Sequence, residues 1–277
     1  MADPDRYAVI GNPIAHSKSP DIHALFAGQT GQVMQYRHLL APMDAFEETV
    51  KQFAAEGGKG LNVTVPFKTQ AFELATSLTP RAKAAGAVNT LKFENNTIIG
   101  DNTDGKGLIA DITANAGYPI AGKRVLLLGA GGAARGVILP LLDQQPSRLV
   151  IANRTLARAR ELADYFSDAG KIEVCGFDGI SGEFDIVINA TSAGLDDAMP
   201  PISAAVFAKP SLALDMVYGD QLTAFLRFAR EHGAEVRDGF GMLVEQAAES
   251  FFVWRGVHPD TEPVFSAMRA KPSPESA

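Results

Sequence analysis

The sequence predicts an α/β protein with two domains, each built around a mainly parallel β-sheet. Short apolar runs alternate with helix-like segments in both halves of the chain, as is typical of strands joined by crossover helices. A glycine-rich turn directly after the apolar run at 125–128 marks a second such unit. The chain has 277 residues and is 46% hydrophobic, so it can bury a sizeable core in each domain.

In the first half, the pattern predicts strands at 7–11, 34–42 and 60–66. Helices are predicted at 20–31 and 43–58, because both segments are helix-like and end on glycine. The run "NTLKFENNTIIGDN" has two β-prone halves about a polar centre, which predicts a hairpin. The first domain should therefore contain a parallel sheet with an antiparallel extension.

From residue 105 the pattern restarts with a helix over 105–117. Near-continuous apolar strands follow in "KRVLLLG", "RLVIAN", "FDIVIN" and "SLALDMV", with helices between them, as in a doubly wound sheet. A short strand at 234–239 precedes the helix at 241–256, whose periodicity does not decide which domain it packs against. We expect the polar end at 270–277 to fray, and Cys175, the only cysteine, to be a buried, unreactive thiol.

The charge balance excludes several functions. The chain has 25 Lys and Arg against 32 Asp and Glu, a net charge of -7, and no basic run that could follow a phosphate backbone, so we expect no binding to nucleic acid or membranes. The sequence starts without a secretory signal, and no apolar stretch reaches the roughly 20 residues of a spanning helix, which predicts a cytoplasmic protein. The 5 histidines lack ligand spacing, so no metal site is expected.

The stretch "VLLLGAGGAARG" matches a dinucleotide-binding turn of the G-x-G-x-x-A form. Gly129 would allow the tight turn, Gly131 the close approach of a pyrophosphate, and Ala134 the packing of the next helix on the sheet. The residues whose backbone would surround the phosphates are Gly129, Ala130, Gly131, Gly132 and Ala133. We therefore expect a Rossmann-like second domain; the alternative is a glycine-rich turn without a ligand.

The end of the next strand indicates which dinucleotide is bound. An NAD site has Asp or Glu there to hold the ribose 2′-hydroxyl, whereas this chain has Asn153, Arg154 and Thr155, followed by Arg158. Guanidinium groups and a hydroxyl suit a 2′-phosphate, because arginine presents a charged fork of donors. NADP(H) is the expected cofactor. Arg158 could instead be a solvated helix residue, so Arg154 and Thr155 carry the prediction.

Polar clusters in the first domain lie where strand-like runs give way to loops: "SKS", "NVTVPFK", "AVNT" and "GDNTDG". The carboxyl ends of parallel strands share one edge of a sheet, so these clusters could converge there. Reduction of a ketone by hydride leaves negative charge on oxygen. Lys68 could donate a proton to that oxygen, and Asp104 could hold the lysine or accept a hydrogen bond from the substrate. Taken singly, Lys68 could be a surface residue and Asp104 a turn residue or helix N-cap.

The motifs "GNPIAHSKSP", "NVTVPFK", "GAVNT", "GDNTDG", "GAGGAARG", "NRT" and "GFGMLVEQAA" occur in this order. Over residues 7–262 the chain thereby resembles the biosynthetic, NADP-dependent shikimate dehydrogenases. The resemblance implies reversible reduction of 3-dehydroshikimate to shikimate by NADPH, in the route to chorismate and the aromatic amino acids. It implies a substrate-binding and catalytic domain of residues 1–104 plus 241–277, separated by a crevice from an NADP-binding domain of residues 105–240. A small-molecule substrate is the expected partner, and the oligomeric state, a homodimer included, stays open.

The resemblance also implies roles for single residues. Ser17 and Ser19 would bind the substrate carboxylate, although the residues alone predict Ser19 as a helix N-cap with Pro20 at the first helical position. Lys68 would be the catalytic acid and base, with Asp104 as its partner. The residues implied to hold the substrate hydroxyls are Thr64, Asn89, Asp104 and Gln246.

Further implications concern the surroundings of the nicotinamide. Tyr218 matches a tyrosine near the substrate, and Met216 and Gly239 match positions near the nicotinamide, but each could serve packing or turn formation instead. Pro80 stands where some relatives have an acidic residue close to the nicotinamide, so that residue's role is not carried over.

Three alternatives stay open. A quinate/shikimate dehydrogenase accepts an additional ring hydroxyl and tends to use NAD, against which Arg154 argues. A methylene-tetrahydrofolate dehydrogenase has a similar architecture and a catalytic lysine but no role for "SKSP". A non-catalytic NADP(H)-sensing protein would keep the glycine turn and Arg154 but would not need Lys68 with Asp104.

Overall fold

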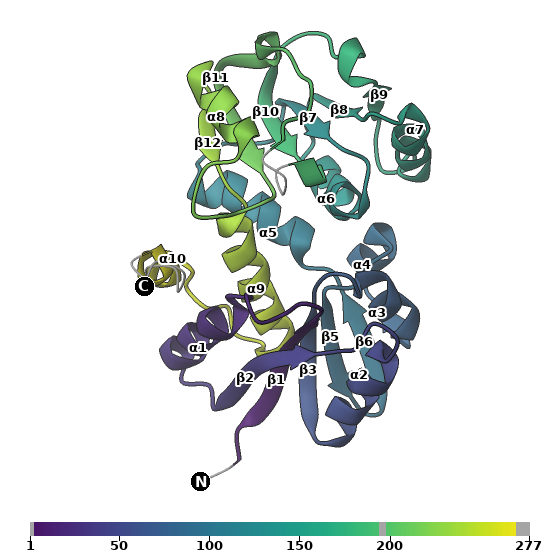
Figure 1. Ribbon diagram of the computed structural model, residues 1–277, viewed down its shortest axis with the longest axis vertical. Coiled ribbons are helices and arrows are strands. Elements are labelled where there is room, and N and C mark those ends of the chain that lie inside the picture. The colour runs from purple at the N-terminus through teal and green to yellow at the C-terminus, as the bar shows by residue number, and fades with distance from the viewer. Residues whose placement is uncertain (1–2, 194–197, 270–277) are drawn as a thin grey trace. The chain divides into compact units, whose positions relative to one another are not determined.

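The computed structural model describes residues 3–193 and 198–269 (Figure 1). Contacts between Cα atoms divide the chain into two compact units, Met1–Gly107 with Val244–Ala277, and Leu108–Leu243. Each unit contains its own six-stranded sheet with helices, which confirms the predicted fold class of two α/β domains. The predicted fraying at 270–277 lies outside the described residues.

The sheet of the first unit has the strand order β2-β1-β3-β5-β6-β4. Its strands are β1 (Asp5–Gly11), β2 (Met34–Leu40), β3 (Gly58–Val63), β4 (Ser77–Leu78), β5 (Thr90–Glu94) and β6 (Thr97–Asp101). β1 pairs in parallel with β2 and β3, whereas β5 and β6 form a hairpin that joins β3 in antiparallel direction. The predicted parallel sheet with an antiparallel extension is therefore confirmed; β4, parallel to β6, was not predicted.

Helices lie on both faces of this sheet (Figure 1). They are α1 (Ser19–Thr30), α2 (Phe46–Ala55), α3 (Lys68–Leu74), α4 (Pro80–Ala85), α10 (Glu262–Arg269) and the larger part of α9 (Phe240–Arg255). Successive residues of β1 face opposite sides: Ala8 and Ile10 join the core under α2 and α3, while Tyr7 packs on Trp254 of α9. The predicted helices α1 and α2 are present, and the short helices α3 and α4 are additional.

The sheet of the second unit has the order β12-β11-β10-β7-β8-β9, and every neighbouring pair is parallel. Its strands are β7 (Arg124–Leu128), β8 (Arg148–Ala152), β9 (Glu173–Cys175), β10 (Phe184–Asn189), β11 (Phe207–Asp215) and β12 (Glu235–Arg237). The chain winds outward from β7 in both directions, which confirms the predicted Rossmann-like sheet. The prediction that Cys175 is buried was wrong: the residue is only half-buried because β9 is an edge strand. This partial burial raises the pKa of the thiol.

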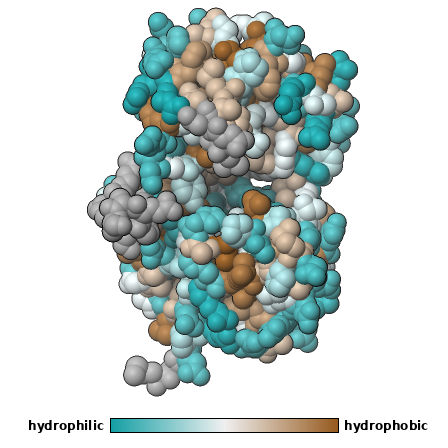
Figure 2. Space-filling model, viewed as in Figure 1, coloured by the Kyte–Doolittle hydropathy of each residue, from teal (hydrophilic) through white to brown (hydrophobic). Residues whose placement is uncertain are grey.

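The helices of the second unit are α6 (Gly132–Asp143), α7 (Leu156–Tyr165) and α8 (Ala224–Glu231), with short 3-10 turns η2 (Phe177–Gly179) and η4 (Ala204–Val206). α5 (Asp104–Ala110) begins in the first unit and continues as a π-helical turn, η1 (Asp111–Asn115), in place of the single helix predicted there. The core contains Leu126, Val187 and Phe225. No helix of the described residues is long and apolar enough to cross a membrane. On the face seen in Figure 2, hydrophilic residues cover much of each unit.

Candidate active site

Lys68 and Asp104 form an ion pair at the carboxyl edge of the first sheet. Lys68 is the first residue of α3, shortly after β3, and Asp104 is the first residue of α5, shortly after β6. The distance from Lys68 Nζ to Asp104 Oδ2 is 2.6 Å. The two side chains keep 33% and 18% of their surface exposed, so both groups remain accessible to a small molecule. The structure thus brings the two residues together, while their catalytic role stays a prediction.

The buried amide of Asn89 fixes the Asp104 carboxylate. Asn89 directly precedes β5, which runs antiparallel to β3 and therefore begins at the same sheet edge. Its Nδ2 donates to Asp104 Oδ1 at 2.8 Å and to Thr103 Oγ1 at 2.9 Å, while its Oδ1 accepts from the Thr103 N–H at 2.9 Å. The amide cannot turn over without losing these bonds, because its oxygen only accepts and its nitrogen only donates. Both carboxylate oxygens of Asp104 therefore have a fixed partner.

Gln246 reaches the same cluster from α9. Its Oε1 accepts from Asn89 Nδ2 at 3.2 Å and from Thr103 Oγ1 at 3.4 Å. The residues of α9 from Val244 onward belong to the first unit, which answers the question that periodicity left open. The predicted residues that the structure brings into one hydrogen-bonded cluster are Lys68, Asn89, Asp104 and Gln246.

Ser17 and Ser19 lie between β1 and α1. The Ser17 hydroxyl donates to Ser19 Oγ at 3.2 Å, and Ser19 is almost fully buried. The predicted N-cap was wrong: Lys18 is the N-cap residue and Ser19 is already the first helical residue. The reason is that Ser17 Oγ, one position earlier, accepts the free Ser19 N–H at 3.3 Å. The two hydroxyls nevertheless lie together, as binding of one carboxylate requires.

Thr64 is half-buried and lies against the end of β1. A Cβ at Gly11 would be 2.6 Å from Thr64 Cγ2, so glycine is needed for this close approach. The Thr64 N–H donates to the Ile10 carbonyl at 3.0 Å, and the Asn12 N–H donates to the Val65 carbonyl at 3.2 Å. These bonds hold the loop with "SKSP" beside the loop with "VPFK".

An ion-pair network that the sequence did not indicate braces this cluster. The Arg81 guanidinium makes two hydrogen bonds of 2.7 Å to the Asp101 carboxylate and one of 2.6 Å to Glu249. Burial alone would raise the pKa of Asp101, but hydrogen bonds from Arg81 and Thr79 outweigh it and lower that pKa. Asp101 ends β6 and Glu249 lies in α9, so the network fixes the elements that carry Asp104 and Gln246. Pro80 is the first residue of α4, next to Arg81.

The predicted dinucleotide turn lies between β7 and α6. Gly129 has φ 107°, and a Cβ there would be 3.1 Å from the Ala190 carbonyl, so the turn requires glycine. At Gly131 or Gly132, by contrast, an added Cβ would meet nothing among the described residues within 4 Å, which leaves open space beside the turn. The first turn of α6 has no side-chain cap, and Ala134 is fully buried against the sheet. Open space beside uncapped N–H groups fits a bound phosphate.

The residues predicted to bind the 2′-phosphate follow β8. The Asn153 amide donates to the Thr155 carbonyl at 2.9 Å and shapes the entry into α7, of which Thr155 is the N-cap. Arg154, Thr155 and Arg158 are exposed. Within 3–193 and 198–269, no carboxylate pairs with either guanidinium. These donors fit a phosphate ligand, and the assignment stays a prediction.

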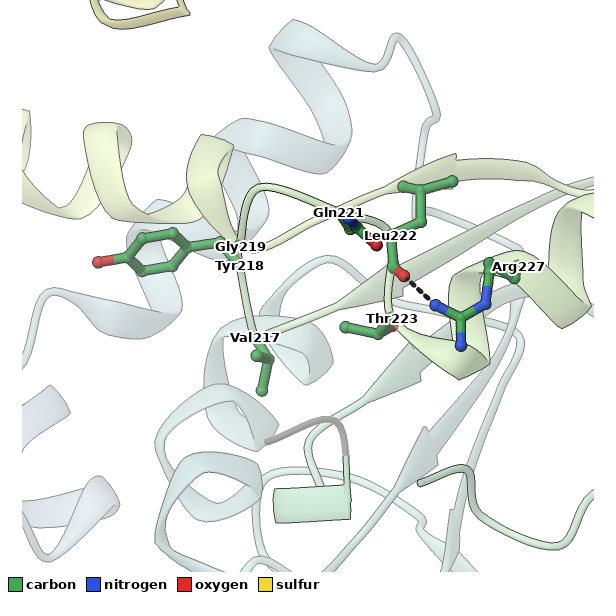
Figure 3. A pocket seen from close by; sticks show the side chains of 7 residues that line it. All are labelled: Val217, Tyr218, Gly219, Gln221, Leu222, Thr223 and Arg227. Atoms are coloured by element: carbon green, nitrogen blue, oxygen red, sulfur yellow. Dashed lines mark hydrogen bonds between the residues drawn. The ribbon is translucent and has the colours of Figure 1, made fainter. Parts of the chain in front are cut away.

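Met216, Tyr218 and Gly239 lie at the carboxyl ends of β11 and β12. A Cβ at Gly239 would be 2.3 Å from the Met216 carbonyl oxygen, so these two backbone segments require glycine at their contact. Burial raises the pKa of Tyr218. A small cavity of about 240 Å³ lies here. Figure 3 shows the Tyr218 ring pointing away from Thr223 and Arg227. The lining residues are Val217, Tyr218, Gly219, Gln221, Leu222, Thr223 and Arg227.

Asp215, which the sequence reasoning missed, anchors this loop. The fully buried carboxylate accepts hydrogen bonds from Thr223 Oγ1 at 2.7 Å, from Asn189 Nδ2 at 3.0 Å and from the Val217 N–H at 3.0 Å. Burial raises the pKa of Asp215, and the hydrogen bonds oppose this only in part. No local pattern marks such a residue, because Asn189 lies on another strand and Thr223 lies eight positions further along the chain.

Polar residues beneath the Lys68 cluster were missed as well. They are Tyr36, Asn62, Thr90, Thr103 and Ser250. The sequence could have pointed to Asn62, Thr90 and Thr103 only because these residues lie inside the motifs quoted above. Tyr36 and Ser250 read as ordinary strand and helix residues.

The fold and the two sets of residues define a class of protein. A doubly wound parallel sheet with a glycine turn and exposed arginines suits a phosphorylated nicotinamide dinucleotide, and a paired lysine and carboxylate suit proton transfer to a reacting carbonyl. Among the described residues, no cluster of His, Cys, Asp and Glu could hold a metal ion. The class is that of the nicotinamide-dependent α/β dehydrogenases.

Comparisons with known proteins narrow this class to one family. Family models match in three places: the shikimate dehydrogenase substrate-binding domain over residues 9–91, shikimate / quinate 5-dehydrogenase over 111–196, and the shikimate 5′-dehydrogenase C-terminal domain over 239–269. The chain is 63% identical over 267 residues to a shikimate dehydrogenase (NADP(+)) of Herminiimonas arsenicoxydans, which covers 96% of this chain and 98% of the relative.

Solved structures agree with this match. An Ael1 enzyme from Pseudomonas putida is 52% identical with a TM-score of 0.92, over 95% of this chain and 97% of that one. Shikimate 5-dehydrogenase from Thermus thermophilus, in complex with NADP(H) and shikimate, is 33% identical with a TM-score of 0.86, over 96% and 98%. The chain therefore belongs to the shikimate dehydrogenase family.

Proposed function

We propose that this chain reversibly reduces 3-dehydroshikimate to shikimate with NADPH, in the biosynthesis of chorismate and the aromatic amino acids. The observation that carries the proposal is the Lys68–Asp104 pair, held at 2.6 Å with Asn89 on the second carboxylate oxygen. Reduction of the ketone needs a proton donor for its oxygen. Lys68 and Asp104 come from two of the motifs quoted above, and their side chains are hydrogen-bonded to each other.

NADPH, when bound, supplies the hydride to the ketone carbon. As negative charge develops on the ketone oxygen, the Lys68 ammonium donates a proton to it and stabilises the charge. Asp104 keeps the ammonium in place at 2.6 Å, and Asn89 prevents the carboxylate from rotating. In the reverse direction the same lysine, as a neutral amine, removes the proton from the substrate hydroxyl.

The remaining polar residues of the first unit would orient the substrate. Ser17 and Ser19 would donate to its carboxylate, and Thr64, Asn89, Asp104 and Gln246 would hold its hydroxyl groups, with Tyr218 near the ring. Such charged hydrogen bonds are the stronger kind, so the paired serines would contribute much of the affinity for an anionic substrate.

NADP(H) would be held by residues of the second unit. The backbone of residues 129–133 would meet the pyrophosphate, Asn153, Arg154, Thr155 and Arg158 would surround the 2′-phosphate, and Met216 and Gly239 would adjoin the nicotinamide. In this proposal residues 1–104 with 241–277 form the substrate domain and residues 105–240 the NADP domain. The homodimer, the cytoplasmic location and the lack of nucleic-acid binding stay predictions.

The test is turnover of shikimate with NADP+, followed by NADPH absorbance, with quinate and NAD+ in parallel. Lys68→Ala should lower kcat by roughly 10²- to 10⁴-fold with unchanged NADPH affinity. Lys59→Ala, an exposed lysine in β3, is the matched control and should keep the rate. Turnover of quinate with NAD+ at a similar rate would favour the broader quinate/shikimate type. NADP+ binding without turnover of any pair would favour a sensor.

A further inference from the structure

The candidate site lies where two loops leave the paired part of the first sheet. The pairing of β5 with β6 runs as far as Thr90 and Asp101, and one further main-chain bond joins the Asn89 N–H to the Asp101 carbonyl at 3.0 Å. Residues 102–104 then follow β6 and lead into α5. The position of the Asp104 main chain therefore depends on contacts between these two loops.

The Asn102 side chain bridges the loops. Its Oδ1 accepts the Asp104 N–H at 3.1 Å, and its Nδ2 donates to the Ala87 carbonyl at 3.0 Å. The amide can adopt only this orientation, because its oxygen must face the N–H and its nitrogen must face the carbonyl. Asn102 keeps only 4% of its surface exposed, so water has little access to replace the two bonds.

The start of α5 explains why this bridge is needed. Asp104 is the first residue of the helix, and the first N–H groups of a helix have no partner within it. Asn102 satisfies the Asp104 N–H from two positions earlier, a local bond that asparagine side chains form readily. The bond to Ala87 ties this helix start to the loop that carries Asn89.

The loop before β5 is also bound to the main chain of the lysine, because the Val88 N–H donates to the Lys68 carbonyl at 2.9 Å. Lys68 and Asp104 are thus joined twice. One connection is the direct bond between their side chains, at 2.6 Å. The other runs between their main chains by way of Val88, Ala87 and Asn102. In this second connection Asn102 supplies the one side chain, so a substitution there can remove it.

We propose that Asn102 is a positioning residue for proton transfer: it holds the Asp104 main chain where the carboxylate meets the Lys68 ammonium. The proposal rests on the proposed function of Lys68 and Asp104. Asn89 holds the carboxylate itself, whereas Asn102 holds the main chain from which that side chain extends. Asn102 acts through Asp104 and touches neither substrate nor cofactor in this role.

The first test compares Asn102→Ser with Asn102→Cys, which differ in one atom. A serine hydroxyl can accept the N–H two positions further on, whereas a thiol accepts only weakly. We expect Asn102→Cys to lower kcat/KM for shikimate about tenfold, as for two lost hydrogen bonds, and Asn102→Ser about threefold, as for one. The KM for NADP+ should stay unchanged in both. Equal losses in the two variants would argue that the bond to the Asp104 N–H has no role, and would overturn the proposal.

The matched control is Thr76→Val, at a side chain that also bridges to main-chain groups of the hairpin. Thr76 Oγ1 accepts the Ile98 N–H at 3.0 Å and donates to the Ile98 carbonyl at 3.3 Å, near the start of β6 and thus at the other end of that strand from Asp104. This variant should keep kcat/KM within twofold of wild type. A tenfold loss would mean that any bond lost along β6 slows the enzyme, which would contradict a specific role of Asn102.

A double variant tests whether Asn102 acts through Asp104. In an Asp104→Ala background there is no carboxylate to position, so Asn102→Cys should change the remaining kcat/KM less than twofold. The full tenfold loss in that background would overturn the proposal, because independent sites add in free energy.

The proposal and the function beneath it fail in different ways. Absence of wild-type turnover of shikimate with NADP+ would refute the proposed function. Normal wild-type turnover together with an Asn102→Cys enzyme within twofold of wild type would refute the positioning role alone. If Asn102→Cys did not fold, Asn102→Ser would be measured in the wild-type and Asp104→Ala backgrounds. A threefold loss that disappears in the second background supports the role, and any other result overturns it.

Discussion

Replacement of His23 by leucine should remove a loss of stability that the wild type shows between pH 7 and pH 5. His23 is fully buried in α1, and among the described residues neither ring nitrogen has a hydrogen-bond partner. Burial lowers the pKa of His23 to about 3, and an interaction with the Asn62 side chain opposes this only in part. The imidazole is therefore neutral in the folded protein between pH 7 and pH 5.

The size of the effect follows from the difference between the two pKa values. An unfolded histidine has a pKa of about 6.5, so as the pH falls the unfolded state takes up this proton first and the folded state loses stability. Between pH 7 and pH 5, one such histidine lowers the free energy of unfolding by about 2 kcal/mol, and by about 4 to 5 kcal/mol if the pH falls to about 3.

Urea unfolding followed by tryptophan fluorescence measures this difference. Trp254 is the only tryptophan, its ring centre lies 5.4 Å from that of His23, and it reports on the first unit. The decrease in the free energy of unfolding from pH 7 to pH 5 should be about 2 kcal/mol smaller in His23→Leu than in wild type. This holds whatever the absolute stabilities of the two proteins. His16→Ala, which removes an exposed imidazole, should keep the wild-type decrease. An equal decrease in wild type and His23→Leu would refute the buried neutral histidine.

Three further predictions concern other parts of the chain. Arg154→Ala should raise the KM for NADPH about tenfold or more, with Arg160→Ala as an exposed control, and an unchanged KM would place the phosphate site elsewhere. Arg81→Ala should destabilise the first unit by on the order of 2 kcal/mol in neutral urea unfolding, because two shielded carboxylates lose their partner. Hydrogen bonds from Arg81 hold the pKa of Asp101 below its usual value in the wild type, so the difference in the free energy of unfolding between wild type and Arg81→Ala should shrink as acid protonates this carboxylate, and a constant difference would argue against the charge effect. Gly241→Ala would put a Cβ 2.0 Å from the Asp111 carboxylate and should lower the melting temperature. Gly131→Ala is the control: its Cβ meets open space, so it should leave the melting temperature unchanged but weaken NADPH binding. Equal melting temperatures of the two variants would contradict the predicted clash at Gly241.

Elements with a strong local signal could be predicted from the sequence. The hairpin at 89–102 turns on Asn95 and Asn96, whose φ angles of 50° and 61° lie in the left-handed region that asparagine tolerates. The turn at Gly129 similarly carries its own signal. The helices α3 and α4 are too short for an apolar period to show, and β9 is a three-residue edge strand whose position depends on its pairing with β8.

The residues of the candidate site likewise fall into those that the local sequence marks and those that it does not. Lys68 and Asp104 could be found because their chemistry suits proton transfer and both follow strand-like runs. Arg81, Asp101 and Glu249 could not, because the two ion pairs of Arg81 span 20 and 168 positions and depend on how β6 and α9 pack. Tyr36 was missed for the related reason that its hydrogen-bond partner, Asn62, lies on another strand.

The pairing register of β3 with β5 explains how such distant residues meet. Leu61 and Leu91 are paired across these strands, and both are fully buried in the core under α2 and α3. Side chains alternate between the faces of a sheet, so this apolar pair places its neighbours, Asn62 and Thr90, opposite one another on the other face. A slip of one residue would move a leucine out of the core and a polar side chain into it. Burial of two leucines on one face therefore enforces the alignment of Asn62 with Thr90 on the other, where the two side chains are hydrogen-bonded at 3.2 Å.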